Sequence, residues 1–458
     1  MAIKKYLLKT IIVFLIILFF CTAVLPAEKE LPLTLEESIE IALKHSVIIN
    51  AAKEGVRASE SKKKGAFTGF LPKLSTSYSY KKLHEAPESK LTESPVTAGT
   101  KNNYRWELEL KQPIFAGGSI LANYQINMLG EDISRMEEKA TILNIIQEVK
   151  EAYFNILKTE RIMGVARQSV EQLKMHRDVA KNFYDVGIIP KNDLLYAEVE
   201  LANGNQFLVR AENRVELARA KFNTVLRRGI NAPVKIEDIL CYKPFQKDAA
   251  DCVKIALENR PEIKVYSMKV EQAEKQVKMT KSGFLPSLDL VGNYSRFGDD
   301  PDMKGSQYED QENWHIMAVA NWDIWEWGRT KHKVDSDLSR KNQAADELVA
   351  IEDRIALDVK SYYLFLKEAE KHIFVAKKTI EQAEENFRIN EERYKERVAT
   401  STDVIDAQTL LTRAKSDYYN ALSNYNIALA RLERSMGVGK EIAGSRQETG
   451  DSRQQVEE

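Results

Sequence analysis

The chain has little of what builds a disulfide scaffold, a metal site or a strongly charged surface. Its 458 residues include three cysteines, six histidines and twelve prolines, and 67 basic residues are balanced by 68 acidic ones. A net charge of −1 without a dense block of lysine and arginine argues against nucleic acid as a partner. The histidines are scattered without metal-ligand spacing, so we expect no enzyme, no metal and no cofactor. Cys241 and Cys252 make no disulfide framework and are expected to be free thiols.

The amino terminus carries an export signal. Residues 1–27 begin with lysines, continue through an apolar stretch from Ile11 to Cys21, and end in a small residue, Ala27. This stretch is short for a comfortable membrane span, although an uncleaved anchor stays open. Cys21 follows the bulky Phe20, where lipid-attachment sites have a small residue, so we expect no lipidation. After export, a bridge between the two remaining cysteines is chemically permitted.

The sequence contains one pattern twice, at a separation of about 210 residues. The motif Gly-Phe-Leu-Pro at 69–72 returns at 283–286, and Tyr184 with the Asp-Leu pair that follows it returns as Tyr394 with Asp-Val. Because each copy holds two alternating segments and two very long helical ones, neither copy can bury its surfaces alone. We expect a signal peptide at 1–27, a first repeat at 28–238, a second repeat at 239–439 and a polar flexible tail at 440–458.

Four segments alternate between apolar and polar side chains. They cover residues 74–80, 104–110, 288–294 and 314–325, separated within each copy by the predicted loops 83–103 and 298–311. Their length of roughly ten residues suits tilted strands that cross a bilayer. The charged cluster within 322–327 fits a membrane-interface girdle better than a carboxylate site. The aromatic residues expected at the membrane interface are Tyr78, Tyr80, Tyr104, Trp106, Tyr294, Trp314, Trp322 and Trp325.

The remaining sequence predicts long helices. The first covers 33–64 and opens with a capping box of Thr34 and Glu37, and its counterpart in the second copy begins near Asp251. A continuous helical path from 118 to 184 would extend on the order of 100 Å, which no compact globular domain needs.

Heptad spacing of apolar residues predicts a coiled coil. In the second copy the seam runs from Ile355 to Phe387 and resumes from Val404 to Leu432 after a turn near 397–401. Small residues recur at every seventh position, so that neighbouring helices can approach closely. In the first copy these small residues are Ala197, Gly204, Ala211 and Ala218. An ordinary amphipathic core helix would explain one such stripe but not two in register.

Four strands cannot close a barrel, because even the smallest barrels use about eight. Open sheet edges cannot face lipid, where every unpaired backbone group is destabilising. The chain must therefore share its barrel with copies of itself in a closed ring. The alternation of strand faces predicts a wet lumen, which the long helices would extend away from the membrane. We expect an α+β fold with an internal duplication.

The chain resembles the TolC-type outer membrane efflux proteins over most of its length after the signal. The resemblance rests on the duplicated layout, the two Gly-Phe-Leu-Pro segments, the run 112–118 and the two hairpin tips. It implies a trimeric outer-membrane β-barrel, with four strands per chain, that continues into a long periplasmic α-helical coiled-coil barrel. The implied role is the exit duct of a tripartite efflux or type I secretion system. The implied partners are a periplasmic adaptor (membrane fusion) protein, an inner-membrane pump of RND or ABC type, and outer membrane lipid.

The resemblance also implies which tip residues meet the adaptor. At the first tip, Val186, Gly187 and Ile188 are similar to the surface that receives the hairpin of the adaptor. Val398 and Ala399 hold the matching place at the second tip. Ala399 stands where the family has a latch arginine, which leaves the adaptor contact at this tip open.

A second set of tip residues resembles the family's periplasmic gate. Tyr394 would join a latch between neighbouring helices, and Asp193 is a further residue of the gate or lumen. Arg397 stands where the family usually has glycine, and it stays open whether Arg397 substitutes in a charge latch or weaker contacts hold this entrance. Asp403 and Asp406 would project acidic rings into the lumen. Their spacing of three places both carboxylates on one helix face, where mutual repulsion would raise their pKa values. Asp403 could also cap a helix, instead of or while lining the pore.

A periplasmic coiled-coil scaffold or adaptor without a pore is the alternative from another class. It accounts for the helices and the export signal, but not for four segments that present aromatic and charged faces at bilayer length. Within the channel interpretation, the cargo stays open between drugs, metals and proteins, because no residue decides it.

Overall fold

The computed structural model describes residues 32–89 and 96–439 of the chain. The predicted signal peptide at 1–27, with Cys21, and the predicted tail at 440–458 lie outside the described residues. The chain divides into two compact units, each assembled from both repeats. We call Met1–Lys44, Val149–Cys241 and Ile380–Ser423 the tip unit, and His45–Glu148, Tyr242–Thr379 and Asn424–Glu458 the strand unit.

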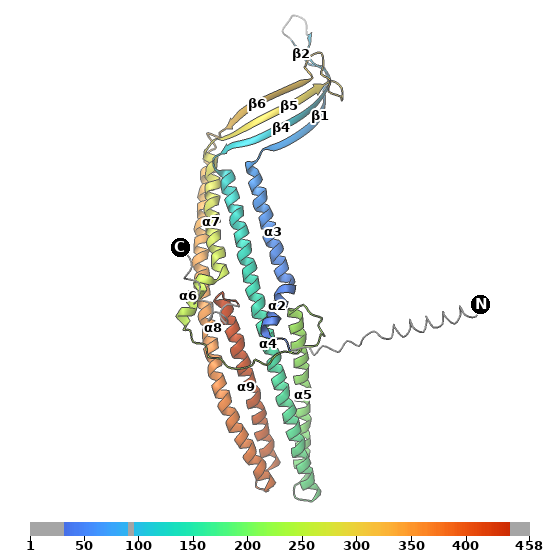
Figure 1. Ribbon diagram of the computed structural model, residues 1–458, viewed down its shortest axis with the longest axis vertical. Helices are drawn as coiled ribbons and strands as arrows, with labels where there is room; N and C mark the ends of the chain where they lie inside the picture. The colour runs from blue at the N-terminus through green and yellow to red at the C-terminus, as the bar shows by residue number, and fades with distance from the viewer. Residues whose placement is uncertain (1–31, 90–95, 440–458) are drawn as a thin grey trace, which may run out of the picture. The chain divides into compact units, whose positions relative to one another are not determined.

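The strand unit contains a four-stranded antiparallel sheet. Its strands are β1 (Lys73–Lys82), β4 (Asn102–Ala116), β5 (Ser287–Gly298) and β6 (Glu312–Asn321), which lie side by side in the order β1-β4-β5-β6 (Figure 1). Each repeat supplies one antiparallel pair, and β4 joins the two pairs through β5. The four predicted strands and the duplication are therefore confirmed.

Aromatic pairs cross the sheet between neighbouring strands. The rings of Tyr80 and Tyr104 stack with centroids 4.6 Å apart, and those of Trp106 and Tyr294 meet edge to face at 5.9 Å. The register shifts near Pro113, which has no backbone N–H to donate to the ladder. The sheet thus has aromatic cross-strand contacts but two outer strands, β1 and β6, that pair on one side only.

The predicted bounds differ from the structure at the last strand and in the first loop. The fourth predicted segment ends at Asn321 rather than Trp325, because Asn321 pairs with Ser287, the first residue of β5, and Pro286 before it has no backbone N–H to continue the ladder. The indole Nε1 of the next residue, Trp322, donates to the carbonyl of Phe284 at 3.2 Å. The predicted loop 83–103 contains two short strands, β2 (Glu88–Ser89) and β3 (Val96–Thr97).

The predicted helix 33–64 is two helices, α2 (Leu35–His45) and α3 (Val47–Phe67). The break lies at Ser46, whose backbone is extended and whose hydroxyl accepts a hydrogen bond from the Ile49 N–H at 3.3 Å. The capping box at the start of α2 is confirmed, because the Thr34 N–H donates to Glu37 Oε2 at 2.9 Å and the Glu37 N–H donates to Thr34 Oγ1 at 3.2 Å.

The counterpart in the second repeat is also divided, into α6 (Ala249–Asn259) and α7 (Pro261–Lys281), with a proline at the first position of α7. Single-turn 3₁₀ helices at Thr68–Phe70 and Ser282–Phe284 then lead from α3 and α7 into β1 and β5. Among the helices of residues 32–89 and 96–439, none is both long and apolar enough to cross a membrane.

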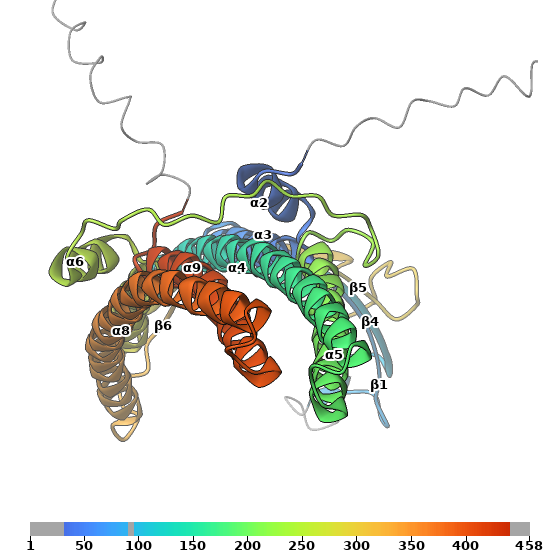
Figure 2. The same ribbon diagram turned by 90° about the horizontal axis from the view of Figure 1, so that it is seen from below.

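The long helices form two hairpins, which Figure 2 shows from below. The first consists of α4 (Ser119–Asp185) and α5 (Lys191–Val225), and the second of α8 (Arg329–Lys395) and α9 (Ser401–Ser435). In the tip unit the predicted seam is buried: Ala383, Leu411 and Ala414 form one cluster, against which Ile380 and Phe387 pack. The predicted coiled coil is confirmed.

A close approach of α4 and α5 explains one of the recurring small residues. A Cβ atom at Gly204 would lie 2.8 Å from Leu173 Cδ1, so a larger side chain would require the Leu173 side chain to move. Some of the contacts between the hairpins are polar: Gln408 Nε2 donates to Gln172 Oε1 at 2.7 Å, and the hydroxyls of Thr412 and Ser169 lie 3.1 Å apart. In the tip unit, hydrogen bonds between side chains therefore join the two hairpins together with apolar packing, because Ile405 of α9 lies in one buried cluster with Leu173 of α4 and Leu194 of α5.

Candidate functional site

The first hairpin turns through a Schellman motif. The Ile188 N–H donates to the Phe183 carbonyl and the Gly187 N–H donates to the Tyr184 carbonyl, both at 2.8 Å. Gly187 has a φ of 74°, the left-handed conformation that glycine adopts without a Cβ clash. The side chains of Val186 and Ile188 are 69% and 39% exposed, so the turn presents apolar surface to solvent.

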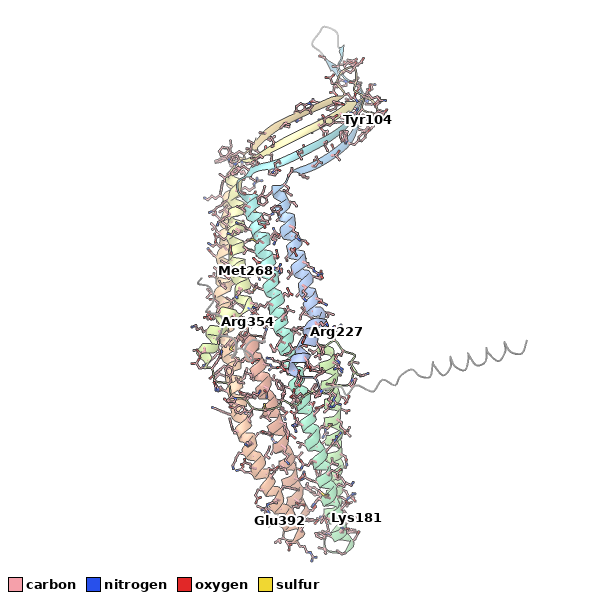
Figure 3. The ribbon with its side chains drawn as sticks, viewed as in Figure 1. Tyr104, Lys181, Arg227, Met268, Arg354 and Glu392 are labelled. Atoms are coloured by element: carbon pink, nitrogen blue, oxygen red, sulfur yellow. The ribbon has the colours of Figure 1, made fainter. Side chains whose placement is uncertain are left out.

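The second hairpin repeats this turn with a different residue at its strained position. The Val398 N–H donates to the Arg393 carbonyl at 2.8 Å and the Arg397 N–H donates to the Tyr394 carbonyl at 3.0 Å. Arg397 therefore occupies the position of Gly187, with a φ of 63°. Val398 is 66% exposed and Ala399 is half-buried. Lys181 and Glu392, labelled in Figure 3, mark the two hairpins near these turns.

Replacing Arg397 by glycine is expected to stabilise the second turn by about 0.5–1 kcal/mol, because the left-handed conformation costs a side chain about 1–2 kcal/mol and glycine returns part of that in backbone entropy. Amide hydrogen exchange of residues 393–403 should then slow by roughly two- to fivefold. Gly187→Ala is the matched control, because it places a side chain at the same left-handed position of the first turn, and it should accelerate amide hydrogen exchange in that turn. Faster exchange in Arg397→Gly would mean that the guanidinium itself stabilises the turn.

Asp403 caps helix α9, which is one of the two roles that the sequence left open. The N–H and the hydroxyl of Thr400 both donate to Asp403 Oδ2 at 2.8 Å, and the Asp403 N–H donates to Thr400 Oγ1 at 3.2 Å. Within one chain, the hydrogen bonds from Thr400 lower the pKa of Asp403, the opposite direction to the rise expected from repulsion. Asp406 is exposed on the same helix.

A buried cluster joins the two hairpins just above the turns. Nε2 of His176 on α4 lies 2.8 Å from Oγ of Ser401 at the start of α9, and both residues are buried. The Tyr394 ring on α8 lies 4.9 Å from the His176 ring and 5.6 Å from that of Phe183. This cluster was not predicted, because His176 is one of several scattered histidines in the sequence and no local spacing pairs it with Ser401.

Burial sets the charge state of this cluster. It lowers the pKa of His176 to about 4, against a smaller opposing effect of Glu391, so the imidazole is neutral at pH 7. Burial also raises the pKa of Tyr394, and the charge of Asp193 raises it further, whereas Ser401 acts in the opposite direction. The Tyr394 hydroxyl is buried without a hydrogen bond of normal geometry in the part of the chain that is described.

The cluster borders a cavity of about 150 Å³ between α4, α8 and α9. His176 and Tyr394 form part of its wall, and Gln172, Glu391 and Lys395 add polar and charged groups. Of the predicted gate residues, Tyr394 is therefore in the buried cluster and Asp193 acts on it electrostatically, whereas Arg397, Asp403 and Asp406 are exposed at the turn or on α9.

The predicted interface aromatics lie on the sheet of the strand unit and directly after it. Tyr78, Tyr80, Trp314, Trp322 and Trp325 are exposed, and Tyr104, Trp106 and Tyr294 are half-buried. Within the described ranges, no group of three or more histidine, cysteine or carboxylate side chains has the arrangement of a metal site.

Comparison with known proteins gives a consistent result. The family model described as "Outer membrane efflux protein" matches residues 38–226 and 252–438, once in each repeat. The outer membrane efflux protein BepC of Brucella suis is 21% identical over 420 residues, covering 91% of this chain and 85% of that protein. The outer membrane protein TolC of Escherichia coli is 21% identical over 318 residues, covering 67% and 64%.

Solved structures share the fold. The CmeC outer membrane channel of Campylobacter jejuni superimposes with a TM-score of 0.77 at 19% identity, covering 88% of this chain and 85% of that one. The outer membrane protein VceC of Vibrio cholerae superimposes with a TM-score of 0.76 at 17% identity, covering 88% and 96%.

Proposed function

The chain belongs to the outer membrane efflux protein family, and we propose that three copies of it form one duct, open to a periplasmic adaptor at the hairpin tips. The chain is thus an outer membrane efflux channel that extends into the periplasm. Through the adaptor, the duct would receive substrates from an inner-membrane pump of RND or ABC type and release them outside. The cargo class stays open between drugs, metals and proteins.

The open sheet is the observation that carries the proposal of a shared barrel. Strands β1 and β6 each pair on one side, and both are exposed along almost their whole length. Such edges are not tolerated in lipid, where their backbone groups would lack hydrogen-bond partners. If β6 of one copy pairs with β1 of the next, three copies close a barrel of twelve strands, above the minimum of about eight.

The hairpin turns support the proposed adaptor contact. Val186, Ile188 and Val398 are exposed apolar side chains on two tight turns, and both turns are held by the same backbone hydrogen bonds. Exposed apolar side chains on rigid turns suit a protein partner that inserts between or onto them. Gly187 and Ala399, which have little or no side chain, would let the backbone of that partner approach closely.

The exposed carboxylates on α9 support the proposed acidic ring in the lumen. Replacing Asp403 and Asp406 together by asparagine is expected to reduce the preference for cations several-fold, because a threefold channel would lose six charges from a narrow bore. Asparagine is chosen rather than alanine, because its side-chain oxygen can still accept the Thr400 N–H and cap α9. The measurement is the reversal potential of the purified channel in planar bilayers under a KCl gradient.

A matched control removes two carboxylates elsewhere in the tip unit. Glu212 and Glu216 on α5 are exposed and pair with Arg167 and Arg219, so Glu212→Gln with Glu216→Gln should leave the reversal potential unchanged. Unchanged selectivity in the Asp403 and Asp406 variant would remove both carboxylates from the lumen. Absence of any conductance from the unmodified protein would overturn the duct itself.

A further inference from the structure

The junction between β6 and α8 has the two most exposed aromatic side chains among the described residues of the strand unit, Trp325 and Trp327. Trp322, Trp325 and Trp327 are 57%, 75% and 86% exposed, and Ile324 between them is 78% exposed. They lie at the end of the sheet from which α8 begins, opposite the end where Tyr104 is labelled in Figure 3. Apolar side chains this exposed, and this close together in sequence, mark a surface that binds another phase or molecule.

The backbone at Trp327 is strained, and the other repeat shows how the strain could be avoided. Trp327 and Gly328 have φ values of 53° and 80°, and the corresponding turn before α4 uses Gly117 and Gly118 at 60° and 86°. A tryptophan in the left-handed region is unfavourable by roughly 1–2 kcal/mol relative to the ordinary region. Because the indole makes no compensating burial, its place at this position points to a role outside the folded chain.

Basic side chains follow the tryptophans. Asp323 and Glu326 both lie within ion-pair distance of Arg329, which offsets one of their two negative charges. Lys331 and Lys333 at the start of α8 are exposed and make no ion pair with any described residue. The segment therefore presents indoles followed within one to two helical turns by unpaired positive charge.

The first repeat has no equivalent of this combination. Its junction, 112–123, contains Ile114, Phe115 and Leu121 as exposed apolar side chains, but no tryptophan and no charged residue. The asymmetry shows that the fold itself needs neither the indoles nor the lysines at this position. Both are present at the junction of the second repeat alone.

We propose that the β6–α8 junction, residues 322–333, is a binding site for the anionic headgroups of phospholipid in the periplasmic leaflet. The proposal rests on the outer membrane duct proposed above, which places this end of the sheet at the periplasmic surface of the bilayer. Indoles settle at the headgroup level, and lysines just beyond them attract anionic lipid. A trimer would carry three such sites, one per chain, each at a β6–α8 junction.

Lipid quenching of tryptophan fluorescence tests this site on the full chain. Trp106→Phe with Trp314→Phe leaves the three junction tryptophans as the only reporters. This protein is reconstituted in phosphatidylcholine vesicles that contain a minor fraction of dibrominated lipid, either phosphatidylcholine or phosphatidylglycerol. Brominated phosphatidylglycerol is expected to quench about two- to fivefold more strongly, and Lys331→Gln with Lys333→Gln should abolish this excess.

The matched control is Lys81→Gln with Lys82→Gln, which replaces two exposed lysines at the end of β1, at the other end of the sheet from the junction. This variant should retain the stronger quenching by brominated phosphatidylglycerol. Equal quenching by the two lipids in the parent protein, or an excess that survives in the Lys331 and Lys333 variant, would overturn the proposal. Equal quenching is also the outcome if the junction binds a protein instead. Channel conductance in the same vesicles distinguishes failure of this lipid site from failure of the proposed duct. A conducting channel without lipid preference refutes the lipid site alone, whereas a protein that does not conduct also refutes the duct.

Discussion

Lowering the pH from 7 to 4 is expected to destabilise the hairpin tips by up to about 3 kcal/mol through one side chain, His176. Its imidazole is buried and hydrogen-bonded to Ser401, and burial lowers its pKa from the ordinary 6.5 to about 4. Each unit of pKa difference between the folded and unfolded chain is worth about 1.4 kcal/mol. Glu391 acts against the shift, but it does not reverse its direction.

The direction of the pH effect follows from which state binds the proton first. Because the pKa of His176 is lower in the folded chain, the unfolded or opened tip takes up a proton first as the pH falls below about 6.5. The stabilising contribution is complete above that pH, declines between about 6.5 and 4, and is lost below. Hydrogen exchange of residues 172–180 and 398–408, corrected for the intrinsic pH dependence, should report this opening.

His176→Gln isolates the cause. Glutamine does not titrate, and its amide can still bond to the Ser401 hydroxyl, so the loss of protection between pH 6.5 and 4 should disappear. His372→Gln is the control, because His372 is exposed on α8 and pairs only with the exposed Glu368. Equal loss of protection in the parent protein and in His176→Gln would assign the pH effect to other groups.

The sequence predicts the parts of the fold that have a local periodicity. Apolar and polar residues alternate with a period of two in the four strands, and apolar residues recur with heptad spacing in the coiled coil. Both patterns are recognisable because they are repeated over many residues. The errors fall where one residue ends a pattern. Ser46 interrupts a helical run by capping the next helix, and the aromatic pattern continues at Trp322 although the partner strand β5 begins only at Ser287, opposite Asn321.

The candidate site is less visible in the sequence, because its contacts join distant positions. His176 and Ser401 are 225 residues apart, and no spacing along one helix brings them together. The cap at Asp403, in contrast, follows the same spacing as the capping box of Thr34 and Glu37, so its signal was present in the sequence. The strained backbone of Arg397 can be inferred from the sequence only by comparing the two turns, because Arg397 occupies the position of Gly187 in the first turn.

Tyr394 is the side chain on which the proposed gate depends most. Its ring packs against His176 and Phe183, but its hydroxyl is buried without a hydrogen bond of normal geometry among residues 32–89 and 96–439. An unsatisfied buried hydroxyl costs about 1–3 kcal/mol, and the Ser401 hydroxyl nearby is already bonded to His176. Because the hydroxyl is covered within its own chain, a neighbouring copy in the proposed trimer would supply the missing partner, and so form a latch, only if the side chains that cover it move.

Tyr394→Phe is therefore expected to favour the open state of the periplasmic entrance by roughly 100-fold, because three latch bonds of about 1 kcal/mol each are lost together. The measurement is the open fraction of single channels in planar bilayers at low voltage. Tyr184→Phe removes a hydroxyl from an exposed tyrosine at the other tip and should leave the open fraction unchanged. A hydroxyl that stays unpaired in the trimer gives the opposite pattern, since Tyr394→Phe would then raise the melting temperature without opening the channel.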